Sequence, residues 1–134
     1  MKPRQYRLLM QWILVLVAIH SIVFGLSLIV LPIPVIEYFG FSLEEKFFAD
    51  QGGVFHLIIA VAYIMAARDP ENSSRLVFLS YITKFTATVF LISYFLFEKQ
   101  IIMVLLSGIA DFLMGLAILV SYRLFLKHPE QPGK

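Results

Sequence analysis

Four titratable residues lie inside long apolar stretches of this sequence. His20, His56, Lys84 and Asp111 each fall near the middle of a different stretch. A lysine or aspartate at the centre of a bilayer costs about 2.5–3.5 kcal/mol on insertion scales, so such side chains face the protein interior and find partners. Histidine titrates near neutral pH. Together these four residues could hold the polar part of a ligand or exchange protons.

The spacing of Lys84 and Asp111 predicts a buried ion pair. If two antiparallel helices carry them and turn near residues 98–100, residues whose numbers sum to about 197 lie at the same level. Asp111 is then level with Thr86, and Lys84 is about 3 Å further along the helix axis. In a bundle of low dielectric constant, each of these charges makes the other tolerable.

Three further polar residues share the helical faces of this pair. Tyr81 and Thr88 lie about one turn on either side of Lys84, and Ser107 lies one turn before Asp111. They are candidates for a ligand site or a proton pathway. The alternative is structural: the ion pair sets only the register of two helices, and each histidine is a hydrogen-bonded packing residue. No metal site is predicted.

Four apolar segments must position these residues, and they span about 8–31, 43–67, 76–97 and 101–126. A helix that crosses a bilayer needs about 20 mostly apolar residues. Pro32 and Pro34 end the first helix, whereas Ser42 and Glu45 form a capping-box pattern that begins the second helix at Leu43. Backbone groups in lipid must be satisfied within each segment. We therefore expect an all-α integral membrane protein, one up-and-down four-helix transmembrane bundle over residues 1–134.

Composition supports a membrane protein and excludes several functions. Hydrophobic residues make up 60% of the 134 residues and charged residues 15%, against about 45–50% and 25% in soluble domains. The net charge of +2, from scattered basic residues, does not favour nucleic acid as a partner. The chain has no cysteine, which excludes disulfides, thiol redox chemistry and iron–sulfur clusters. The first apolar run is too long for a signal peptide, so we expect it to persist as a helix.

The basic residues predict the orientation. Eight of the eleven lie at the N-terminus, around the loop between the second and third helices, or at the C-terminus. Only Lys46 and Lys99 lie on the other side, and Lys84 is inside a span. Because lysine and arginine are enriched on the cytoplasmic side, we expect both termini in the cytoplasm and the protein in the cell (inner) membrane.

Three motifs carry a resemblance to a known group of proteins. They are DQGGVFHLIIAVAYIMAARDP at 50–70, YITKF at 81–85 and SGIADFLMG at 107–115. With them the chain resembles small bacterial four-helix membrane proteins of the DoxX-like kind, although Ala110 stands where the group has glycine before the aspartate. The resemblance covers most of the chain. It implies the four-helix fold and marks Lys84 and Asp111 as candidate functional residues. Some of these proteins are linked to quinone-dependent oxidation of sulfur compounds, but the resemblance does not assign a reaction to this chain.

Two hypotheses for function follow. In the first, the polar cluster binds a small hydrophobic molecule, quinone-like or lipid-like, or relays protons, with no cofactor required. In the second, the protein is an accessory subunit of a membrane complex or a homo-oligomer, and the ion pair serves assembly. A haem b anchor through His20 and His56 is a weaker alternative, because two histidines without a wider signature are little evidence. A small multidrug exporter would need a carboxylate in the first helix, which has none.

Overall fold

The chain forms four long helices and one short one. The computed structural model describes residues 2–129, so the end of the predicted polar tail, including Lys134 among the counted basic residues, lies outside the described part. The helices are α1 (Pro3–Val30), α2 (Ile33–Tyr38), α3 (Phe47–Arg68), α4 (Ser74–Phe97) and α5 (Ile102–Lys127). Residues 2–129 contain no strand, and the four long helices are long and apolar enough to cross a membrane. The predicted all-helical class is confirmed.

The segment between α1 and α3 differs from the prediction. The second long helix begins at Phe47 and not at Leu43, and no side chain caps its N-terminus. The capping box predicted at Ser42 and Glu45 is therefore wrong. The prolines that end α1 begin the unpredicted helix α2, because proline suits the first turn of a helix as well as the end of the preceding one. Gly40, with φ of 95°, takes the left-handed conformation that follows this short helix.

The long helices pack as two pairs, α1 with α3 and α4 with α5. Glycines bring the first pair together: a Cβ on Gly53 would lie 2.6 Å from the carbonyl oxygen of Gly25. In the second pair, a Cβ on Gly108 would lie 3.0 Å from Ile92. Small residues let helix backbones approach closely in a membrane, where packing rather than hydrophobic burial holds helices together.

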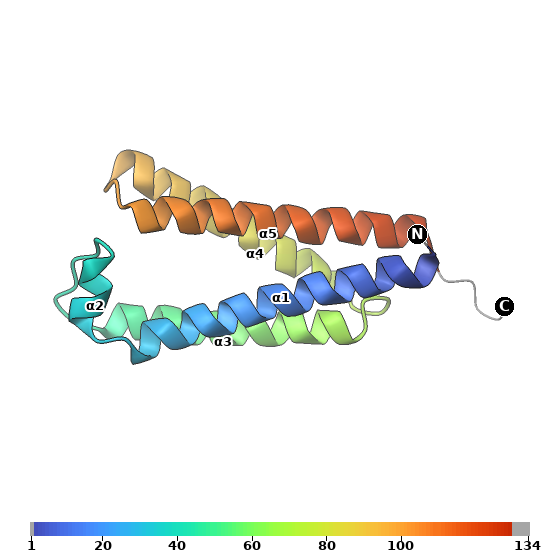
Figure 1. Ribbon diagram of the computed structural model, residues 1–134, viewed down its shortest axis with the longest axis horizontal. Coiled ribbons are helices and arrows are strands. Elements are labelled where there is room, and N and C mark those ends of the chain that lie inside the picture. Colours follow the sequence, from blue (N-terminus) through green and yellow to red (C-terminus); the bar gives the residue numbers. More distant parts are fainter. Residues whose placement is uncertain (1, 130–134) are drawn as a thin grey trace.

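The two pairs join at one end of the molecule and separate at the other. Figure 1 shows the start of α1 and the end of α5 close together, whereas α2 lies at the far end between diverging pairs. The joined end contains the hydrophobic core, which is formed by Met10, Leu14, Val17, Ala18, Tyr63, Ala66, Ala67, Val77, Ile118 and Phe125. The separated end has no equivalent buried cluster among residues 2–129.

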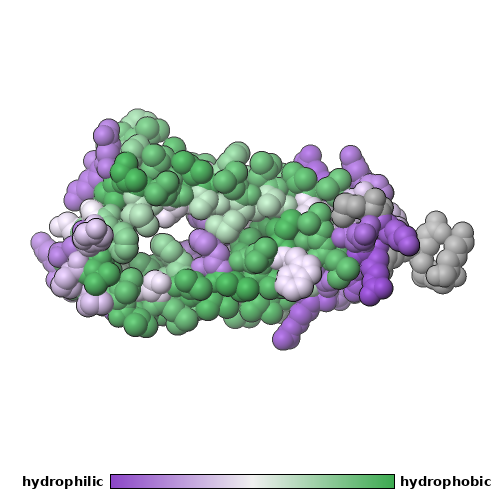
Figure 2. Space-filling view, viewed as in Figure 1, coloured by the Kyte–Doolittle hydropathy of each residue, from purple (hydrophilic) through white to green (hydrophobic). Residues whose placement is uncertain are grey.

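The surface is apolar along the middle of the helices and hydrophilic at both ends (Figure 2). This pattern matches a molecule whose central band faces lipid.

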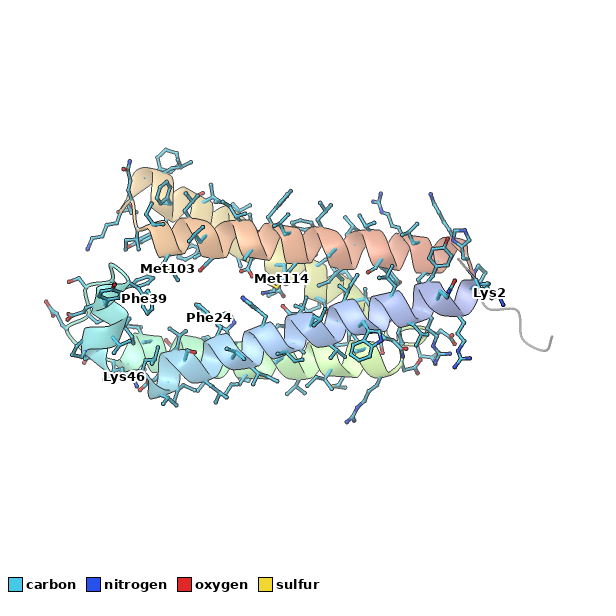
Figure 3. All side chains as sticks on the ribbon, viewed as in Figure 1. Lys2, Phe24, Phe39, Lys46, Met103 and Met114 are labelled. Atoms are coloured by element: carbon cyan, nitrogen blue, oxygen red, sulfur yellow. The ribbon has the colours of Figure 1, made fainter. Side chains whose placement is uncertain are left out.

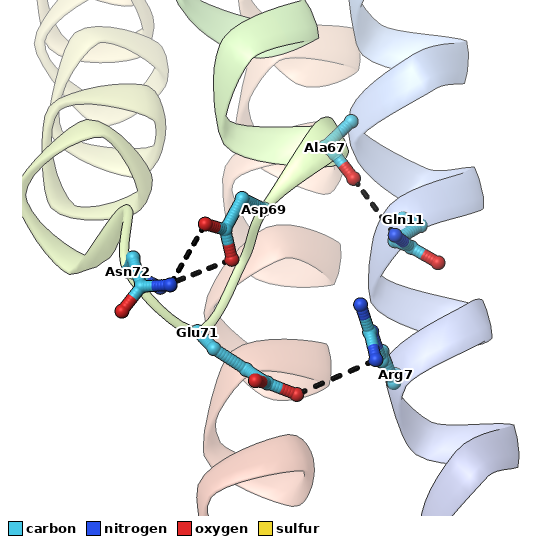
Figure 4. A network of polar contacts seen from close by, with 6 residues as sticks. All are labelled: Arg7, Gln11, Ala67, Asp69, Glu71 and Asn72. Atoms are coloured by element: carbon cyan, nitrogen blue, oxygen red, sulfur yellow. Dashed lines mark hydrogen bonds and ion pairs between the residues drawn. The ribbon is translucent and has the colours of Figure 1, made fainter.

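Polar contacts attach the end of α3 and the loop that follows it to α1 (Figure 4). Gln11 Nε2 donates to the carbonyl of Ala67 at 3.0 Å, and Arg7 lies 3.5 Å from Glu71. Within the loop, Asn72 Nδ2 donates to Asp69 Oδ2 at 2.8 Å. This hydrogen bond favours the ionised carboxylate and lowers the pKa of Asp69. The level of α3 against α1 is therefore fixed at the joined end.

Candidate functional site

The predicted ion pair is present and buried. Lys84 Nζ donates to Asp111 Oδ1 at 2.6 Å, and the two side chains are only 3% and 9% exposed. The ring of Tyr63 lies 6.0 Å from Lys84 Nζ, within the range of a cation–π contact. Gly115 allows α5 to approach, since a Cβ there would lie 3.1 Å from Lys84 Cβ. The predicted ion pair between the third and fourth spans is therefore confirmed.

A cavity of about 500 Å³ lies between the separated parts of the two helix pairs. Its lining is mainly apolar and consists of His20, Phe24, Leu28, Ile36, Phe41, Leu43, Phe48, Ala49, His56, Ala87, Phe90, Leu91, Val104, Ser107 and Asp111. Figure 2 shows the opening between the pairs, with hydrophilic residues at its end nearer the middle of the molecule. In Figure 3, Phe24 projects from α1 into this space. Ligand cavities typically measure about 300–1,000 Å³ and have few polar groups, so size and lining both fit one.

One residue from each long helix forms the inner end of the cavity. On each long helix, one lining residue lies nearest the joined end. These four residues are His20 on α1, His56 on α3, Ala87 on α4 and Asp111 on α5. Lys84 lies one turn closer to the joined end than Ala87 and does not line the cavity. It binds Asp111 from the side away from the cavity. Three of the four predicted intramembrane groups therefore meet at one wall, and the fourth supports that wall.

The polar atoms at this inner end are largely free of protein partners. Asp111 Oδ1 accepts from Lys84, while Asp111 Oδ2 accepts no hydrogen bond from the described residues. The rings of His20 and His56 likewise make no hydrogen bond with any of residues 2–129, and His56 Nδ1 is buried. Both rings contact Phe24, with centroids 6.2 Å and 4.8 Å away. His20 itself is exposed, so the buried unsatisfied atom at this end is His56 Nδ1. Buried polar atoms are normally hydrogen-bonded, so His56 Nδ1 indicates a place for an external partner.

The outer end of the cavity is lined by the segment whose structure was predicted wrongly from the sequence. Ile36 of α2 and Phe41 and Leu43 of the following loop line the cavity there. Lys46 holds this loop in place: its ammonium donates to the carbonyl of Ile29 near the end of α1 and lies 3.3 Å from Asp50. A lysine suits this position because the last carbonyls of a helix lack intrahelical partners.

The other predicted site residues divide into two groups. Ser107 lines the cavity, one turn from Asp111. Tyr81 lies outside the lining, where its ring contacts Phe78 and Phe85 at centroid distances of 5.3 Å and 6.4 Å. The hydroxyl of Thr88 donates to the Lys84 carbonyl at 2.9 Å within α4 and also lies outside the lining. The structure therefore does not place Tyr81 and Thr88 with the other candidates.

Sequence reasoning missed the aromatic wall. No functional role was predicted for any phenylalanine, but Phe24, Phe41, Phe48 and Phe90 line the cavity. A signal existed on α1 alone, where Phe24 and Leu28 follow His20 at four-residue spacing and so share its face. The hydroxyls of Ser21 and Tyr63, buried and without a hydrogen-bond partner among the described residues, were also not predicted.

Residues 2–129 contain no group of three or more His, Asp or Glu side chains that could hold a metal ion. In comparisons with known proteins, no protein-family description, no curated protein and no solved structure matches this chain.

Proposed function

We propose that this chain is an integral membrane protein that binds a small hydrophobic molecule, quinone-like or lipid-like, in the cavity between its two helix pairs. The apolar part of the ligand contacts the phenylalanine wall, and its polar part reaches His20, His56 and Asp111. One observation carries the proposal: a cavity of about 500 Å³ ends on partner-free polar atoms from three helices. Mostly apolar walls with a few convergent polar groups are the usual composition of a small-molecule site.

The ion pair by itself also fits the accessory-subunit alternative, in which Lys84 and Asp111 serve only helix register. That alternative needs neither a cavity nor polar atoms facing it. The cavity therefore favours ligand binding over a purely structural pair. Copurification of a membrane-protein partner or a second copy, together with loss of ligand binding in the isolated chain, would favour the alternative.

A proton relay across the whole membrane receives less support than ligand binding. Among the described residues, the hydrophobic core packs between the ion pair and the joined end. Of the buried polar side chains on that side, Ser80 and Ser121 donate to carbonyls of their own helices, and the hydroxyl of Tyr63 lies within the core without a partner among the described residues. The polar layer thus faces the cavity, whereas the side toward the joined end is mainly apolar core.

The proposal also includes the topology. We infer an up-and-down bundle with both termini in the cytoplasm of a cell (inner) membrane. The distribution of basic residues supports this orientation, as does the proximity of the start of α1 to the end of α5 (Figure 1). The cavity then lies in the half of the membrane away from the cytoplasm. Membership of the DoxX-like group is likewise a proposal, supported by the three sequence motifs.

Filling the cavity tests the proposal. Ala87→Trp places an indole at the inner end, whereas the control Val89→Trp changes a side chain of the same helix that is 67% exposed and outside the lining. Binding of 2-naphthol to each protein in lipid nanodiscs is measured by equilibrium dialysis and compared with empty discs. We expect wild type and Val89→Trp to bind more 2-naphthol than empty discs do, and Ala87→Trp to lose this excess binding. Helix content and thermal melting establish folding, and Ala49→Phe on the opposite wall is a second filling variant. Equal excess binding by filled and unfilled proteins, or none by wild type, would refute the proposal.

A further inference from the structure

We infer that the ligand of this cavity carries a neutral hydroxyl group as its polar end, as an alcohol or a phenol does. The inference rests on the proposed function and specifies the ligand's chemistry. Its basis is the order of the charges at the inner end: the carboxylate of Asp111 lines the cavity, and the ammonium of Lys84 lies behind it.

An anionic ligand does not suit this end. Lys84 is 3% exposed at its side chain, and its ammonium already donates to Asp111 Oδ1. A carboxylate or phosphate in the cavity would meet the negative side of the pair, Asp111 Oδ2, without reaching the positive side. It would also lose its hydration among phenylalanines, where an uncompensated charge is expensive.

A hydroxyl group matches the partner-free atoms. Asp111 Oδ2 can only accept a hydrogen bond while the carboxylate is ionised, so it requires a donor. A neutral imidazole offers one N–H donor and one acceptor nitrogen, and neither His20 nor His56 uses them within residues 2–129. A ligand O–H donates to Asp111 and accepts from a histidine N–H at the same time. A ketone or quinone carbonyl accepts from histidine but leaves Asp111 without a donor, so of the quinone-like molecules in the proposed function the hydroxyl-bearing reduced form, a quinol, fits this end.

The cavity dimensions favour a compact ligand. From His20 to Leu28 on α1, the lining extends about 12 Å along the helix axis. A cavity of about 500 Å³ over this length has a larger cross-section than a single extended acyl chain. Four phenylalanines in the wall offer ring faces and edges, which pack well against a ring. A ring-bearing alcohol or phenol therefore fits both the polar end and the walls.

Three probes that share one naphthalene ring test the head group. They are 2-naphthol, its methyl ether and 2-naphthoate, which present a donor, no donor and an anion; a phenol with an ordinary pKa near 10 is neutral at pH 7. Binding to wild-type nanodiscs is measured by equilibrium dialysis, with Ala87→Trp discs as the baseline for partition into lipid. We expect 2-naphthol to bind about tenfold tighter than its ether, the value of one hydrogen bond to a charged group, and naphthoate to bind weakest.

The results separate this inference from the proposed function. If all three probes bind wild type equally above the baseline, the cavity binds ligands but the hydroxyl preference is wrong. Tightest binding of naphthoate or of the ether also overturns the preference. If no probe binds above the baseline, both proposals fail. As a further check, Thr88→Val, next to the site but outside the lining, should leave the tenfold preference unchanged.

Discussion

At the scale of single residues, the central feature is a charge pair that serves two purposes. Lys84 is enclosed by Asp111, Tyr63 and α5, so its ammonium does not face the cavity. Asp111 is paired through one carboxylate oxygen and keeps the other free of protein partners. The lysine thus allows an ionised carboxylate to exist at the wall of an apolar cavity, where an unpaired one would be too costly.

This pairing predicts how substitutions combine. Lys84→Met or Asp111→Leu alone leaves one buried charge without a partner, and each should lower the free energy of unfolding by about 3 kcal/mol. The double variant removes both charges and should be more stable than either single variant. Denaturant unfolding in mixed micelles, followed by circular dichroism, measures this. Destabilisation of the double variant by the sum of the two single effects would contradict a coupled pair.

The pair was predictable from sequence because it depends on local quantities only. Helix rise and a short turn fix the level of Lys84 against Asp111, and the cost of charge in lipid makes them face each other. The cavity beside them was not predictable in the same way. It depends on how far two helix pairs diverge, which is decided by packing between pairs and has no signature in hydropathy.

At the scale of elements, glycines determine which helices stay together. In the α1–α3 pair glycines bring the two backbones together, and in the α4–α5 pair glycines of α5 pack against side chains of α4. The contact between pairs relies on the hydrophobic core at the joined end. Four helices could be predicted from length and hydropathy. The start of α3 and the existence of α2 could not, because the charged residues before Phe47 fit both a helix start and a loop. That loop became the outer wall of the cavity.

Two adjacent glycines of α3 provide a matched test of this packing. A Cβ on Gly53 would lie 2.6 Å from the Gly25 carbonyl oxygen, but a Cβ on Gly52 would meet only Leu28 at 3.6 Å. Gly53→Ala should therefore destabilise the protein by about 1–3 kcal/mol, because the α1 backbone must move. Gly52→Ala should be neutral or stabilise by up to about 1 kcal/mol, since alanine favours helix. Thermal melting of both variants in the same detergent measures the difference, and equal melting temperatures would contradict close α1–α3 packing.

At the scale of the whole molecule, the two ends have different roles. The joined end is packed and carries most of the basic residues, and the separated end contains the cavity. In the proposed orientation, a ligand would reach the site from the outer half of the membrane. Both the side of the membrane and the position of the ligand can be tested on the intact chain.

The absence of cysteine makes the orientation easy to measure. Single cysteines at the exposed positions Gln5 and Asn72 should react with a membrane-impermeant maleimide only after cells are permeabilised. Cysteines at Glu44 and Gln100, also exposed, should react in intact cells. The reverse pattern would place the termini outside and contradict the topology inferred from the basic residues.

The most direct test of the central claim is to locate a bound molecule. A diazirine derivative of 2-naphthol is photolysed with the protein in nanodiscs, and the modified residues are identified by mass spectrometry. We expect modification of the cavity residues Phe24, Phe90 and Ser107, which excess 2-naphthol abolishes and Ala87→Trp prevents. Modification confined to the exposed Leu106 and Val89, without competition, would show that the probe only dissolves in lipid around the helices and would contradict a ligand site in the cavity.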